Sequence, residues 1–183
     1  IPISSEKQLP ILMDHLLTSF INDLTELDAI QFIVYVHTSA VLLPMGSSLF
    51  PCLKKYPELN SCLFFSMSMY KCVSFFKALE MLMNFFTFHQ NHKAIILTGE
   101  IEYTPKLRVV PRSTIVGDAF TATLVSGHSA HHHLLSVHTY FLPGYSSGIY
   151  LTNEKLQQFD ALFISTMIKV IFTTLTNAAV SLD

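Results

Sequence analysis

The chain has 183 residues, with 11 Lys or Arg against 13 Asp or Glu, which gives a formal net charge of −2. Charged residues make up 13% of the sequence and apolar residues 50%, whereas soluble domains usually carry roughly a quarter charged residues. This length predicts one domain with one sizeable core, and the near-neutral charge excludes a general attraction for nucleic acid. The shortage of charge predicts that apolar surface is covered by a partner or encloses a cavity.

The first half of the chain predicts a helix, a strand and a second, longer helix. Apolar residues recur at intervals of three and four over residues 5–24, and the strand predicted over 30–37 is apolar on both faces. An irregular connection follows, marked by Pro44, Gly46, Pro51 and Pro57. Helical spacing returns over residues 61–88 and leaves only a narrow polar stripe. We therefore expect this helix to be buried on most sides.

From residue 93 the apolar period changes from helical spacing to two. The predicted strands cover 94–104, 106–110, 115–126 and 132–142, with a further short strand over 148–152 and a closing helix over 154–179. Consecutive short strands joined by brief turns favour an antiparallel meander. We therefore predict a single α+β domain over residues 1–183, with an antiparallel sheet of about five strands packed against long, mostly buried apolar helices.

Cys52, Cys62 and Cys72 stand ten residues apart, without a CxxC pair. An odd number at this spacing argues against a disulfide framework. We expect them to be small buried apolar residues, which fits a reducing and therefore intracellular compartment. The two longest stretches that lack or nearly lack charge, 29–53 and 161–182, are interrupted by polar residues, so a membrane-spanning helix is not expected.

A histidine cluster is the most conspicuous group of side chains with chemistry. It consists of His128, His131, His132, His133 and His138. On a strand, His131 and His133 project to the same side and form a two-ligand start for a metal ion, with His37 or Glu100 able to complete it. The alternatives are a polar turn and a contact linked to protonation at about pH 6. Apart from this metal hypothesis, no cofactor is expected.

Charged residues on the predicted strands leave two interpretations open. Glu100 and Glu102 share one face, where they divide acid and base roles or simply face water. Lys106, Arg108 and Arg112 also share a face and either pair with these carboxylates across strands or form a small anion patch. Nothing matches a P-loop, a dinucleotide-binding glycine pattern, a GxSxG elbow or an HExxH helix, so no catalytic residue is assigned.

The order of a strand, a long buried helix and a run of antiparallel strands resembles the hotdog fold of acyl-thioester enzymes. The resemblance is carried by Gly99-Glu100-Ile101-Glu102-Tyr103, Leu107–Val110 and Val116-Gly117-Asp118-Ala119-Phe120. For a chain that is an enzyme, the resemblance implies acyl-thioester chemistry.

Two functions from different classes follow from the apolar excess. The favoured one is a non-enzymatic protein-interaction subunit of a homo- or hetero-oligomeric complex. It would use an apolar helical surface with Ile164, Ile168 and Phe172 at the interface. The alternative is a binder of a lipid, acyl group or other apolar small molecule, or a hotdog-like acyl-thioester enzyme. Its internal pocket would be lined by Phe65, Met69, Phe76, Met83 and Phe86. The expected partners are a protein, a second copy of the chain or an apolar small molecule, with no nucleic acid and no membrane.

Overall fold

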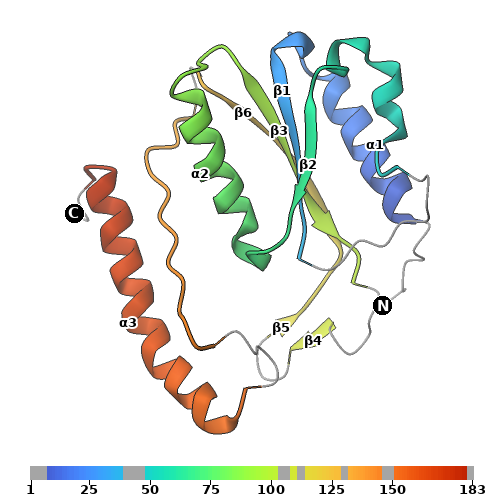
Figure 1. Cartoon of the computed structure of the whole chain (residues 1–183). Coiled ribbons are helices and arrows are strands. Elements are labelled where there is room, and N and C mark those ends of the chain that lie inside the picture. The colour runs from blue at the N-terminus through green and yellow to red at the C-terminus, as the bar shows by residue number, and fades with distance from the viewer. Residues whose placement is uncertain are drawn as a thin grey trace. The chain divides into compact units, whose positions relative to one another are not determined.

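The computed structural model describes residues 8–38, 48–102, 108–110, 114–128, 132–145 and 151–180. The chain divides into two compact units, residues 1–129 and residues 130–183. The first unit contains a mixed sheet with helices, and the described part of the second contains one long helix (Figure 1). A single domain over residues 1–183 therefore stays a prediction.

The first unit contains two α-helices, four 3-10 turns and six strands among its described residues. Its helices are α1 (Gln8–Asn22) and α2 (Ser74–Phe86), and its described 3-10 turns are η1 (Leu27–Ala29), η2 (Pro51–Lys55), η3 (Pro57–Leu59) and η4 (Lys71–Val73). Its main strands are β1 (Ile30–Val36), β2 (Leu63–Met67), β3 (Lys93–Glu100) and β6 (Ala119–Ser126). The short strands β4 (Val109–Val110) and β5 (Thr114–Ile115) pair with each other. Helix α1 and strand β1 confirm the elements predicted over 5–24 and 30–37.

The main sheet has four strands in the order β2-β1-β3-β6. Strand β1 is parallel to both β2 and β3, and β6 is antiparallel to β3, with Lys93 opposite Ser126 and Glu100 opposite Ala119. The α+β class is confirmed, but an antiparallel sheet of about five strands is wrong. A helical crossover through α2 returns the chain parallel to β1, which brief turns cannot do. The arrangement that resembled the hotdog fold is therefore absent from the described residues.

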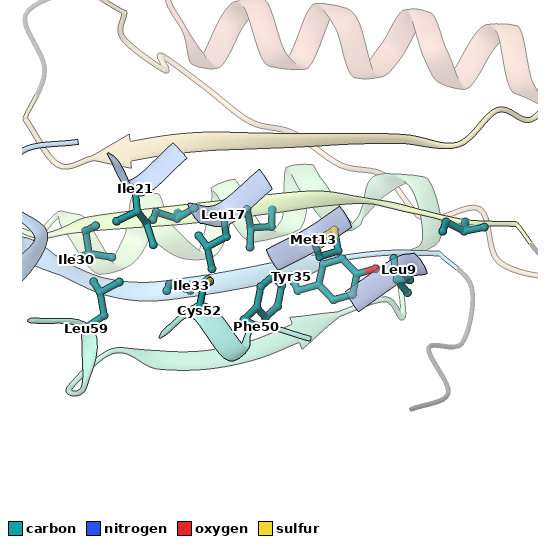
Figure 2. Packing of buried hydrophobic residues seen from close by; sticks show 13 residues of the cluster. Leu9, Met13, Leu17, Ile21, Ile30, Ile33, Tyr35, Phe50, Cys52 and Leu59 are labelled. Carbon is teal, nitrogen blue, oxygen red and sulfur yellow. The ribbon is translucent and has the colours of Figure 1, made fainter. Parts of the chain in front are cut away.

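One face of the sheet packs against α1. Met13, Leu17 and Ile21 of α1 are fully buried against the sheet, and Figure 2 shows them facing Ile33 and Tyr35 of β1. The spacing of these α1 residues at intervals of four places them on one helical face. Phe50, Cys52 and Leu59, from the connection between β1 and β2, close the same cluster from the side.

The opposite face of the sheet packs against α2. Ala78, Leu82 and Phe86 repeat every four residues along the helix and are buried against Val34 of β1 and Ile96 of β3. Because β1 and β3 are covered on both faces, β1 is apolar except for Gln31, and residues 94–97 at the centre of β3 are continuously apolar. This two-sided sheet accounts for part of the apolar excess in the sequence.

The helix predicted over 61–88 is wrong in its first part. Residues 63–67 form β2, whose Phe64 and Phe65 pair with Ile33 and Val34 of β1, and the helix begins only at Ser74. A continuous apolar run fits a buried helix and a buried strand equally well, so its periodicity does not decide between them. The pairing with β1 decides it here.

The predicted strands after β3 are confirmed in part. The strand predicted over 115–126 is divided into β5 and β6, with Gly117 and Asp118 between them. Described residues 132–142 form no strand, since alternation alone supplies no hydrogen-bonding partner. Most of the strand predicted over 148–152 lies outside the described residues.

The second unit contains α3 (Asn153–Asn177), which confirms the closing helix. The hydroxyl of Thr152 caps it by accepting the N–H of Lys155 at 3.3 Å, and the Lys169 ammonium lies 5.5 Å from the ring centre of Tyr140. No described residue of α3 is buried, so the expectation of a mostly buried helix is wrong here. By length and composition alone, α3 could cross a membrane, a weak criterion that core helices of soluble proteins also meet.

Candidate active site

A pocket of about 420 Å³ lies where β1 and β3 end and α2 begins. Parallel strands in a sheet covered by helices open their ligand crevices at their carboxyl ends. The pocket is lined by Val36, His37, Thr38, Lys71, Cys72, Phe75, Phe76, Thr98, Gly99, Glu100, Thr121 and Thr123. A thiol, an imidazole, a carboxylate and an ammonium therefore meet at one end of the sheet.

Cys72 occupies the turn that joins β2 to α2. The Lys71 N–H donates to the Ser68 carbonyl and the Val73 N–H to the Tyr70 carbonyl, both at 3.0 Å, and α2 begins at Ser74. The thiol of Cys72 is free and its residue is exposed. The thiolate is the nucleophilic form of cysteine, and an accessible thiol can reach a ligand in the pocket.

The other two cysteines differ sharply from Cys72. Burial raises the pKa of Cys52 to about 11, helped by its hydrogen bond with Asp14, and burial raises that of Cys62 to about 11. Cys52 is buried and Cys62 half-buried. The expectation of small buried apolar cysteines therefore holds for Cys52 and is wrong for Cys72.

His37 follows the last residue of β1 and is buried, with 8% of its surface exposed. Its ring stacks on Tyr35 with the ring centres 4.8 Å apart, and its backbone N–H donates to the Met67 carbonyl at 3.3 Å. These contacts fix an imidazole at the pocket wall, and an imidazole can act as a general acid or base.

Glu100 connects the ends of the two parallel strands. Its Oε2 accepts the backbone N–H of Thr38 at 2.9 Å, and its Oε1 accepts the Thr38 hydroxyl. From the helix side, Lys71 Nζ donates to the Thr38 carbonyl at 3.0 Å. Lys71 has a φ of 53°, a left-handed conformation that costs a non-glycine residue free energy.

The remaining walls differ in polarity. On the α2 side, Phe75 and Phe76 contact each other edge to face, with ring centres 5.6 Å apart, and Phe76 is half exposed. On the sheet side, the hydroxyls of Thr98 and Thr121 lie 2.5 Å apart. A ligand at Cys72 would meet aromatic carbon on one side and hydroxyl groups on the other.

A larger pocket of about 580 Å³ lies along α1. It is lined by Pro10, Ile11, Asp14, His15, Thr18, Ser19, Asn22 and Pro51. In this pocket, Asp14 accepts a hydrogen bond from the Cys52 backbone N–H at 2.7 Å. The buried Cys52 thiol stays protonated, because burial raises its pKa to about 11. We place the candidate site at the smaller pocket because it combines an exposed thiol with a proton acceptor.

The structure separates the two glutamates of the predicted acid and base pair. Glu100 lines the pocket, whereas the backbone N–H of Glu102 donates to Asp118 at 3.2 Å. Asp118 also lies 2.9 Å from the Arg108 guanidinium, so Arg108 pairs with that aspartate. Lys106 and Arg112 lie outside the described residues.

The five residues predicted to line an apolar pocket are spread over several surroundings. Phe76 lines the Cys72 pocket, Phe65 and Phe86 pack in the α2 core, Met83 is half-buried, and Met69 is 88% exposed.

The predicted metal and interface residues stay predictions. His131 lies outside the described residues and His133 is exposed; within the described ranges no three His, Cys, Asp or Glu side chains could hold a metal ion. Ile164, Ile168 and Phe172 are all exposed on α3.

Comparison with known proteins extends the description of the fold. No family model and no curated protein matches the chain. The chain is similar to ChlB3, described as an acyltransferase, with a TM-score of 0.69 and 17% identity over 95% of this chain and 58% of that one. It therefore spans less than two thirds of ChlB3, and the likeness shows a shared fold alone.

A second similarity is to PksG, an HMG-CoA synthase from Bacillus subtilis. Its TM-score is 0.48, with 22% identity over 66% of this chain and 29% of that one, and we draw nothing from it.

These findings overturn the favoured prediction of a non-enzymatic protein-interaction subunit. The chain has the fold of a protein described as an acyltransferase, and an exposed thiol stands in a pocket of that fold. The prediction used the shortage of charge as evidence of a partner surface. Two cores, one on each face of the sheet, use much of that apolar composition inside the first unit.

Proposed function

We propose that the pocket is an acyl-transfer centre in which Cys72 is the nucleophile. The observation that carries the proposal is the exposed Cys72 thiol in the turn before α2, within a pocket at the carboxyl ends of two parallel strands. The likeness to an acyltransferase fold supports the same chemistry. The sequence pattern does not single out Cys72, because the helix predicted over 61–88 includes it. A strand that ends at Met67, followed by a cysteine just before a helix start, is the signal that would indicate it.

The proposed reaction has two balanced steps. In the first, the Cys72 thiolate attacks the carbonyl carbon of an acyl thioester. The bond between that carbon and the sulfur of the donor thiol breaks, and the leaving thiolate takes up the proton that Cys72 released. In the second, an acceptor amine or thiol attacks the acyl carbon on Cys72, the bond from that carbon to the Cys72 sulfur breaks, and the proton that the acceptor loses returns to the Cys72 sulfur. Each step replaces one acyl–heteroatom bond with another, so no oxidant or reductant is required.

We assign the proton transfer to His37. Its imidazole lines the same pocket, and its stacking on Tyr35 holds the ring in one orientation. An imidazole at the pocket wall can take the thiol proton and return it to the leaving group. Phe75 and Phe76 would receive the apolar part of the acyl group. An intracellular, reducing compartment would keep Cys72 in its thiol form.

Release of free CoA from acetyl-CoA in the presence of an amine acceptor, measured by chromatography of quenched samples, tests this proposal. Cys72→Ser should abolish the release, and His37→Gln should slow it about a hundredfold or more, the usual contribution of a general base. Cys62→Ser is the matched control and should release CoA at the unaltered rate. Equal rates in the Cys72→Ser and unaltered proteins would contradict the proposal.

A further inference from the structure

We infer that Glu100, Thr38 and Lys71 form a clamp that holds the Cys72 turn against the sheet, with Glu100 as a positioning residue and not a catalytic base. The inference rests on the proposed function, since it concerns the same pocket. It assigns a task to three polar residues that the reaction itself does not use.

The clamp is centred on the peptide units around Thr38. Glu100 holds the N–H at 2.9 Å and also the hydroxyl, while Lys71 holds the carbonyl at 3.0 Å. Thr38, two residues after β1, is therefore bonded to Glu100 at the end of β3 and to Lys71, the residue directly before Cys72. These bonds join the two strands and the nucleophile turn into one rigid group.

The backbone of Lys71 explains why the turn needs such support. A φ of 53° is unfavourable for lysine, and it persists only where surrounding contacts hold it. The described contact that reaches this side chain from the sheet is its bond to the Thr38 carbonyl. Loss of Glu100 would free Thr38, and through it the turn that orients Cys72.

The geometry of Glu100 separates positioning from base catalysis. Both of its carboxylate oxygens are bonded to Thr38. A glutamine at this position can keep both bonds: its carbonyl accepts the Thr38 N–H, and its amide donates to the Thr38 hydroxyl, which can turn to accept. A clamp therefore tolerates glutamine, whereas a base does not.

Hydrogen exchange of the Lys71 and Val73 amides, whose bonds define the turn, is the primary test, because it needs no substrate. In Glu100→Ala these amides should exchange about tenfold faster, as expected from the loss of a hydrogen bond to a charged group. Glu100→Gln should restore slow exchange and also the rate and pH profile of CoA release from acetyl-CoA. Thr38→Val should speed exchange and Thr38→Ser should not.

Each outcome either supports or overturns the clamp. Unchanged exchange in both Glu100→Ala and Thr38→Val would overturn it. Where the unaltered protein releases CoA, a Glu100→Gln protein that exchanges normally but releases none would also overturn it. If Glu100→Ala does not fold, the Thr38 pair decides, because valine removes only the hydroxyl bond. Exchange results are independent of acyl transfer, so a failure of the proposed function leaves this test intact.

Discussion

Tyr35 donates a hydrogen bond from its phenol to the carbonyl oxygen of Gly99 at 2.8 Å, and so connects the two parallel strands that carry the pocket. The Tyr35 ring is fully buried and supports the ring of His37. Gly99 has a φ of 134°, a conformation open almost only to glycine. The pocket therefore depends on a buried tyrosine and on a glycine whose replacement would strain the backbone.

Gly99→Ala should destabilise the first unit by about 3 kcal/mol or more, because it combines backbone strain with a steric clash. A Cβ atom at Gly99 would lie 2.3 Å from the Ala119 carbonyl oxygen and 2.7 Å from the Phe120 Cα. Gly117→Ala is the matched control, since a Cβ there meets no atom within 4 Å. Urea unfolding of both variants measures the difference. Equal stabilities would contradict the described pairing of β3 with β6.

Strain at Lys71 can be measured with two substitutions that both remove the ammonium. Alanine at a φ of 53° keeps the strain, whereas glycine relieves it. Lys71→Gly should therefore be more stable than Lys71→Ala by about 1 kcal/mol. Thermal or urea unfolding gives this number directly, and an alanine variant as stable as the glycine variant would show that the turn is not left-handed.

Alkylation should distinguish the three cysteines. At mildly alkaline pH, iodoacetamide should modify Cys72 in the native protein and spare Cys52 and Cys62, whose pKa values burial raises to about 11. Peptide mass spectrometry identifies the modified residue. Labelling of Cys52 before Cys72 would contradict the described burial.

The same raised pKa values predict a pH dependence of stability. As pH rises from 9 towards about 11, the unfolded chain loses the Cys52 and Cys62 protons while the folded chain keeps them, so the free energy of unfolding falls. A Cys52→Ala, Cys62→Ala variant should lose this part of the decline. An equal decline in both proteins would assign it to other groups.

Sequence patterns predicted α1 and α3 from apolar residues at helical spacing, and β1 from a short apolar run of strand length. They failed at residues 63–67, where Phe64 and Phe65 form a strand only because β1 lies beside them. Because of that error the sequence did not indicate a site at Cys72, since this cysteine is a candidate nucleophile only if it lies between a strand and a helix. His37 and Glu100 were noticed as metal ligands, but no periodicity could indicate that parallel pairing brings the ends of β1 and β3 together with the Cys72 turn.

The most direct measurement of the central claim is the mass of the protein and its peptides after brief incubation with acetyl-CoA and acid quenching. We predict that the chain gains one acetyl group and that the peptide containing Cys72 carries it. Cys72→Ser should abolish the thioester adduct and Cys62→Ser should leave it unchanged. An acetyl group found on another residue, or no acetylated chain at any time during turnover of acetyl-CoA, would contradict the assignment of Cys72 as the nucleophile.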